Sequence, residues 1–224
     1  ALGIKKGDRV GIHLPNCPQY PIAYYAALSL GAMIVNINPM YTPDELKLIA
    51  GTTGLTTLIT FDMVLPNIRV LCKAVPIPRV IVTKVTDYIK GLGVSTAASL
   101  DLEKGWHHFS TLLQGSTAAR FPRVQVTPED PALIQFTGGT TGIPKGAVLT
   151  QACSFWNAVN LELDMGFRPA DRDLLVLPMF HIGGIGLFTL PLIHVGGTVV
   201  IPRTFDAGET LRLLQEEKIT LFFA

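Results

Sequence analysis

The sequence has few cysteines and few charged residues, and each shortage excludes classes of protein. The three cysteines, Cys17, Cys72 and Cys153, lie far apart and form no C-x-x-C pair. This argues against a zinc knuckle or a disulfide framework and is typical of a reducing compartment. Charged residues make up only 16% of the chain, and 18 Lys+Arg against 17 Asp+Glu give a net charge of +1. Because there is no basic run, we expect no nucleic-acid partner.

One long segment contains no charge at all. Residues 174–202 include no Asp, Glu, Lys or Arg, and a membrane-spanning helix needs ~20 such apolar residues. Several prolines and glycines would break or weaken a helix there, namely Pro178, Gly183, Gly184, Gly186, Pro191, Gly196 and Gly197. We therefore expect buried strands and a short helix, with a membrane span as the alternative. The expected location is the cytoplasm, and peripheral contact with a membrane stays open.

Apolar residues are abundant, at 48% of 224 residues, so the chain can bury a substantial core. Short apolar runs alternate with helical patterns, which predicts an α/β fold with βαβ arrays of mainly parallel sheet flanked by helices. The expected strands are 9–14, 32–36, 55–60, 79–82, 132–136, 174–177, 198–201 and 219–224. The expected helices are 18–30, one from 43 onward, 64–74, 151–165, 184–195 and 206–217.

Two helix starts carry capping signals. Thr42 precedes a proline and stands three residues before Glu45, the pattern of a capping box, and Asp206 with Glu209 forms a second such pair. Residues 84–129 break the alternation and predict an excursion with one helix. The chain thus divides into a first array at 1–83, the excursion at 84–129 and a second array at 130–224. The apolar run at 219–224 has no turn after it, so we expect this chain to be a piece of a longer one.

The segment most typical of chemistry is TGGTTGIPKG, which follows the expected strand at 132–136. It contains four glycines, three threonines and Lys145 within ten residues. Glycines allow successive backbone N–H groups to point at one anion, hydroxyls add donors and the lysine adds a positive charge. The segment is not a Walker A loop, because Pro144 rather than Gly precedes Lys145. From the residues alone, a polyphosphate site and an ordinary Gly/Thr turn both remain open.

This segment resembles the phosphate-binding signature of the adenylate-forming (AMP-binding) superfamily of acyl-CoA synthetases, luciferases and peptide-synthetase adenylation domains. Two further stretches resemble family motifs in the same order, LGAMIVNINP at 30–39 and LPMFHIGG at 177–184. The stretch at 36–46, with Gly138 where many members have Ser, is most similar to bacterial long-chain fatty acid–CoA ligases. The resemblance covers nearly the whole chain except the excursion.

The resemblance implies an activity in two steps. ATP converts a carboxylic acid to an acyl-adenylate and releases pyrophosphate, and the thiol of coenzyme A then attacks the activated carbonyl. The implied phosphate-binding residues are Thr137, Gly138, Gly139, Thr140, Thr141, Gly142 and Lys145. Thr137 would also lie near Mg²⁺. His181 would line the acyl and nucleotide pocket, with a core histidine as the alternative, whereas His194, His107 and His108 are expected to be structural or solvent-facing.

The resemblance also implies that much of the machinery is missing. The family's magnesium-binding and ribose-binding motifs lie downstream of this chain, and its catalytic lysine belongs to a small C-terminal lid domain. We therefore expect residues 1–224 to be an incomplete large N-terminal domain of the acyl-CoA synthetase-like fold, inactive alone, from a fatty acid–CoA ligase. A ligase for another carboxylic acid and a non-catalytic nucleotide- or acyl-binding module remain as alternatives. A homodimer stays open.

Overall fold

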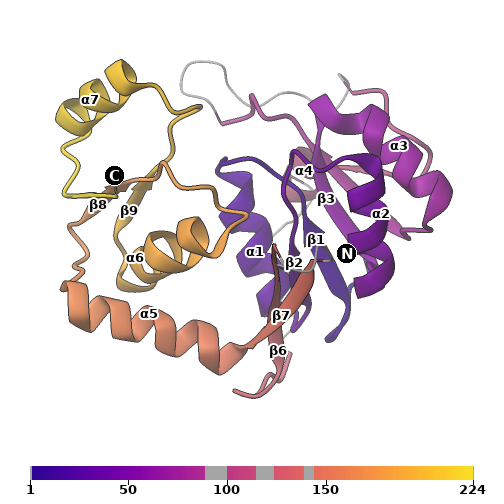
Figure 1. Ribbon diagram of the computed structural model, residues 1–224, viewed down its shortest axis with the longest axis horizontal. Coiled ribbons are helices and arrows are strands. Elements are labelled where there is room, and N and C mark those ends of the chain that lie inside the picture. The colour runs from indigo at the N-terminus through magenta and orange to yellow at the C-terminus, as the bar shows by residue number, and fades with distance from the viewer. Residues whose placement is uncertain (1, 89–99, 115–123, 139–143, 224) are drawn as a thin grey trace.

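The computed structural model describes residues 2–88, 100–114, 124–138 and 144–223 (Figure 1). A larger sheet and a smaller sheet lie side by side, and helices pack around both. The larger sheet has seven strands and is mostly parallel, so the predicted α/β class is confirmed.

The seven-stranded sheet has the order β5-β4-β3-β1-β2-β6-β7. Every neighbouring pair is parallel except β6 and β7, which form an antiparallel hairpin. The strands are β1 (Arg9–Ile12), β2 (Met33–Asn36), β3 (Thr57–Phe61), β4 (Arg79–Thr83), β5 (His107–His108), β6 (Pro131–Thr137) and β7 (Lys145–Thr150). The parallel order means that the carboxyl ends of β1, β2 and β6 meet at one edge of the sheet.

Alternating residues of these strands feed two separate cores, one on each face of the sheet. Ile12 and Ile34 pack with α1 (Gln19–Ser29) and α4 (Phe109–Gln114). Val35, which follows Ile34, and Leu58 of β3 pack on the opposite face with α2 (Pro43–Thr53) and α3 (Leu65–Ala74). This period-two pattern is what a sheet covered on both sides requires. Helices α2 and α3 stand together in Figure 1, and a 3-10 turn, Asp62–Val64, leads into α3.

The capping box predicted for α2 is confirmed. The Thr42 hydroxyl accepts a hydrogen bond from the Glu45 N–H, and the Glu45 carboxylate accepts one from the Thr42 N–H at 2.7 Å. At α7 (Ala207–Glu216) only half of the predicted pair forms. Asp206 accepts from the Glu209 N–H at 2.8 Å, but the Glu209 carboxylate binds Arg212 instead.

The smaller sheet is parallel, with β8 (Arg172–Leu174) between β9 (Thr198–Val200) and β10 (Leu221–Phe222). Helix α5 (Gln151–Met165) runs from the end of β7 toward this sheet. A π-helix, Gly183–Thr189, continues directly into α6 (Leu190–Val195), which packs beside α5. The helix predicted at 184–195 is thus confirmed. In the part of the chain that the structure describes, no helix is long and apolar enough to cross a membrane.

Two strands were missed by the sequence analysis, and the start of a third was misplaced. β7 was missed because it is an edge strand whose first four residues are exposed, and β5 because it has only two residues. β8 begins at Arg172 rather than at Leu174, because its charged first two residues conceal it from an apolar pattern. The boundary between the two sheets also follows β7 rather than residue 130, since β6 and β7 complete the larger sheet.

Asp173 is the buried carboxyl of the central strand β8, with 1% of its surface exposed. Burial raises its pKa from 3.8 to about 7. The folded protein therefore keeps a proton that the unfolded chain releases near pH 4, so stability should fall as pH rises from about 4 to 7 and level off above that. We expect Asp173→Asn to remove this dependence. The melting temperature of the variant minus that of wild type should rise between pH 5 and pH 8, and a constant difference would contradict this.

Candidate functional site

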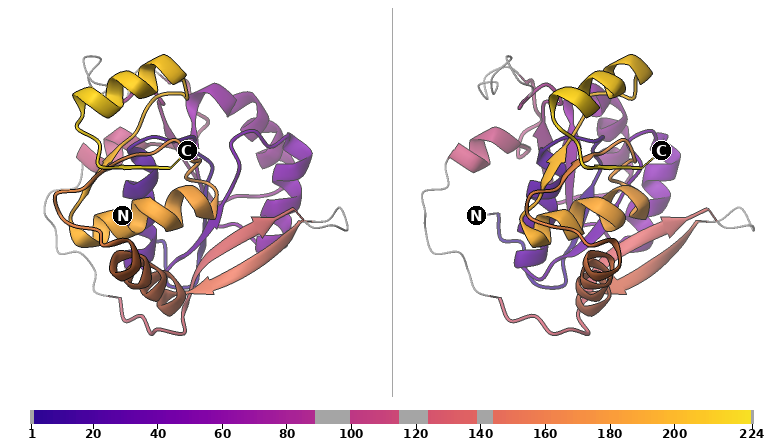
Figure 2. Two further views of the ribbon diagram at one scale, coloured as in Figure 1. Left: turned by 60° about the vertical axis from the view of Figure 1, so that its left-hand side comes forward. Right: turned by 90° about the vertical axis from the view of Figure 1, so that its left-hand side faces the viewer.

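The TGGTTGIPKG segment joins the two strands of the β6–β7 hairpin. Thr137 ends β6 and Lys145 begins β7, and the two residues pair directly across the hairpin. The Thr137 hydroxyl donates to the Lys145 carbonyl at 3.4 Å, and both side chains are exposed. Both views of Figure 2 show the hairpin extending outward from the sheet. A threonine and a lysine with exposed side chains therefore occupy paired positions at its outer end.

Two glycines of the segment lie in the described part of the chain. A Cβ at Gly146 would lie 2.9 Å from the Ile134 side chain and 3.3 Å from the Phe136 ring, so a larger residue there would require these two side chains to move. Gly138 is exposed, with no described atom within 4 Å of such a Cβ. The remaining predicted phosphate-binding residues lie outside the described residues: Gly139, Thr140, Thr141 and Gly142.

A chain of buried polar side chains crosses the carboxyl ends of the strands next to this hairpin. The Tyr20 hydroxyl donates to Asn36 of β2 at 2.7 Å, and the Asn36 amide donates to Gln135 of β6 at 2.9 Å. Gln135 in turn donates to the Phe180 carbonyl at 3.3 Å. Burial raises the pKa of Tyr20, so its hydroxyl stays a donor. Sequence reasoning missed this network, although polar residues inside two apolar strands were a signal for it.

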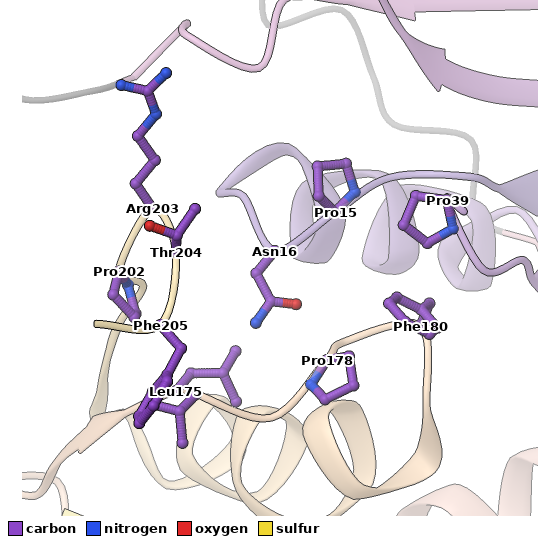
Figure 3. A pocket seen from close by; sticks show the side chains of 11 residues that line it. Pro15, Asn16, Pro39, Leu175, Pro178, Phe180, Pro202, Arg203, Thr204 and Phe205 are labelled. Atoms are coloured by element: carbon purple, nitrogen blue, oxygen red, sulfur yellow. The ribbon is translucent and has the colours of Figure 1, made fainter. Parts of the chain in front are cut away.

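The Phe180 carbonyl belongs to the LPMFH turn, which borders a cavity of about 200 Å³. The cavity lies between the residues that follow β1 and β2 and the segments that follow β8 and β9. In Figure 3 the Asn16 side chain stands between Pro15 and the turn at Pro178. The lining residues are Pro15, Asn16, Pro39, Leu175, Val176, Pro178, Phe180, Pro202, Arg203, Thr204 and Phe205.

His181 is the last residue of this turn and is exposed, so its interpretation as a core histidine is wrong. The ring Nδ1 of His181 accepts a hydrogen bond from the Gly183 backbone N–H at 3.2 Å. The backbone N–H of His181 donates to the Pro178 carbonyl at 3.1 Å. The ring orientation is therefore set by the start of the π-helix. His181 does not line the cavity of Figure 3, although its neighbour Phe180 does. Its predicted pocket role stays a prediction.

Three other histidines, which the sequence analysis expected to be structural or solvent-facing, lie away from this cavity. His107 and His108 form the edge strand β5, and the exposed ring of His194 on α6 contacts the Glu162 carboxylate on α5 at 2.5 Å. Among the described residues no cluster of three or more His, Cys, Asp or Glu side chains could hold a metal ion. Of the described residues, the site at the hairpin thus offers the Thr137 hydroxyl as an oxygen ligand and Lys145 as a cation.

Comparison with known proteins matches the whole chain to one family model, described as AMP-binding enzyme, over residues 1–224. A long-chain-fatty-acid–CoA ligase of Bacillus subtilis is 31% identical over 98% of this chain and 41% of the relative. The 4-coumarate–CoA ligase CCL1 of Humulus lupulus is 29% identical over 98% of this chain and 38% of that relative. The crystal structure of the long-chain-fatty-acid-CoA ligase FadD1 from Archaeoglobus fulgidus superimposes with a TM-score of 0.82 at 31% identity, covering 98% of this chain and 40% of that one. The chain therefore spans about two fifths of the length of these relatives.

Proposed function

Because the chain belongs to the family of AMP-binding enzymes, we propose that it forms the first part of an ATP-dependent fatty acid–CoA ligase. This enzyme joins the carboxylate of a fatty acid to AMP and releases pyrophosphate. The thiol of coenzyme A then displaces AMP to give the acyl-CoA thioester. Since the chain spans 41% of a relative of this kind, we infer that its residues alone do not complete the reaction.

The arrangement of Thr137 and Lys145 is the observation that carries this proposal. The hairpin register pairs a threonine and a lysine at the two ends of a glycine-rich segment, and both side chains are exposed. Such a group of donors suits the oxygens of the β- and γ-phosphates, and it would stabilise the negative charge that builds on departing pyrophosphate. We therefore propose that residues 137–142 and Lys145 contact the phosphates of ATP.

Mg²⁺ fits this site only as an ion that is bound together with the phosphates of ATP. It prefers oxygen ligands and is commonly bound through substrate phosphates and one or two carboxylates. The described residues supply the Thr137 hydroxyl there and no cluster of acidic side chains. In our proposal Thr137 therefore contributes one contact near the ion, which would neutralise phosphate charge.

The acid and the setting of the enzyme are finer proposals. Several relatives are long-chain-fatty-acid–CoA ligases, which favours a fatty acid. The 4-coumarate–CoA ligases among the relatives favour an aromatic acid as the second candidate. We propose a cytoplasmic enzyme without a nucleic-acid partner. Peripheral contact with a membrane and a homodimer stay predictions.

The two candidate acids can be separated by thioester formation. The full product of the gene is incubated with ATP, Mg²⁺ and coenzyme A, together with saturated fatty acids of increasing length or with 4-coumarate. We expect acyl-CoA to form fastest with one of the fatty acids. Faster reaction of 4-coumarate would replace the fatty acid by the aromatic candidate. No thioester from any acid would favour the non-catalytic binding module instead.

A further inference from the structure

The side chain of Asn16 makes two hydrogen bonds to the backbone of the turn that carries Phe180 and His181. Its Nδ2 donates to the Leu177 carbonyl at 2.8 Å, and its Oδ1 accepts from the Met179 N–H at 2.7 Å. These two bonds bridge Pro178, which has no N–H of its own. The Asn16 side chain thus hydrogen-bonds to the backbone on both sides of the proline. Figure 3 shows this side chain reaching the turn from the residues that follow β1.

The turn is fixed from two further directions. Gln135 of β6 donates to the Phe180 carbonyl from the strand that leads to Thr137. On the other side the π-helix packs directly against the turn. The contact is so close that a Cβ at Gly184 would lie 2.2 Å from the Pro178 carbonyl oxygen. The turn therefore cannot shift without breaking one of these contacts. Among these residues, Asn16 makes two hydrogen bonds to the turn.

We propose that Asn16 is a positioning residue, which acts through the 177–181 turn to place Phe180 and His181 relative to the phosphate-binding hairpin. This inference rests on the proposed function. Asn16 acts on backbone atoms of the turn rather than on reacting atoms. Because the proposed phosphate contacts come from the hairpin, loss of Asn16 should disturb the alignment of the reacting groups more than the binding of ATP.

The test uses the full product of the gene with three variants. Asn16→Ala removes both bonds to the turn. Asn16→Asp keeps the side-chain volume and the acceptor for Met179 but loses the donor to Leu177. This variant therefore tests the hydrogen bond to Leu177 even if the alanine variant does not fold. Asn157→Ala is the matched control, since Asn157 donates to the Gly186 carbonyl at 2.9 Å near the middle of the π-helix, away from the turn.

Amide hydrogen exchange tests these contacts of Asn16 without reference to activity. We expect the Met179 amide to exchange at least about tenfold faster in Asn16→Ala than in wild type, because its acceptor is gone, and to be unchanged in Asn157→Ala. Equal exchange of Met179 in wild type and Asn16→Ala would overturn the inference.

Kinetics of acyl-CoA formation test the positioning role. With the fastest-reacting acid we expect kcat to fall about tenfold or more in both Asn16 variants, while KM for ATP stays within about threefold. A kcat within about twofold of wild type in the folded variants, or the same loss in Asn157→Ala, would overturn the inference and leave the proposed function standing. An inactive wild-type product would overturn the proposed function and this role with it.

Discussion

Replacing Lys145 by alanine in the full product of the gene should lower kcat/KM for ATP about ten- to a hundredfold. The reason is the place of Lys145 beside Thr137 at the outer end of the β6–β7 hairpin, where its ammonium group is exposed and available to phosphate oxygens. A hydrogen bond to a charged group contributes about 1.5–3 kcal/mol, and about 1.4 kcal/mol is a factor of ten. Initial rates of pyrophosphate release at varied ATP measure the effect.

The fold should not change in this variant, because the side chain is exposed. The melting temperature should stay within about 2 °C of wild type. Lys73→Ala is the matched control, since Lys73 is an exposed lysine of α3, in the connection between β3 and β4. Its ATP kinetics should be those of wild type. Wild-type kinetics in Lys145→Ala, or an equal loss in Lys73→Ala, would contradict the assignment of the hairpin to the phosphates.

Gly184→Ala should be strongly destabilising. A Cβ there would lie 2.2 Å from the Pro178 carbonyl oxygen, 2.4 Å from its carbonyl carbon and 2.8 Å from the Met179 nitrogen. All three are backbone atoms, so either the π-helix or the turn has to move. Overpacking a filled site costs about 1–3 kcal/mol, and the displaced turn should also lower activity. Denaturant unfolding of the full product measures the loss.

Gly51→Ala provides the opposite result in the same protein. Gly51 is an exposed residue of α2, and nothing lies within 4 Å of where its Cβ would be. Alanine favours a helix interior over glycine by about 1 kcal/mol, so this variant should be slightly more stable than wild type. If Gly184→Ala were as stable as Gly51→Ala, the close packing of the π-helix on the turn would be wrong.

The elements that the sequence predicted well are those whose local signals agree with their packing. The α2 start could be predicted because Thr42, Pro43 and Glu45 each favour it and no tertiary contact opposes them. The strands of the parallel sheet could be predicted because residues such as Val35 and Leu58 are buried on one face while their neighbours are buried on the other. β7 and the start of β8 were not predicted, because these segments form strands through pairing with neighbouring strands and their own residues give no strand pattern.

The candidate site shows the same division. TGGTTGIPKG carries its signal in consecutive residues, so a phosphate-binding segment could be proposed from the sequence. The contacts of Asn16 to Leu177 and of Gln135 to Phe180 join residues 161 and 45 positions apart. Such contacts depend on which strands become neighbours, which a linear pattern does not state. The turn and its two amides therefore required the structure.

The central claim is that this chain belongs to an enzyme that activates a carboxylate with ATP, and carboxylate-dependent ATP–pyrophosphate exchange tests it most directly. The full product of the gene and the 224-residue chain are compared with and without a fatty acid. We predict exchange by the full product only, dependent on the acid. Absence of acid-dependent exchange from the full product would contradict the claim, and exchange by the 224-residue chain alone would contradict its proposed dependence on the rest of the enzyme.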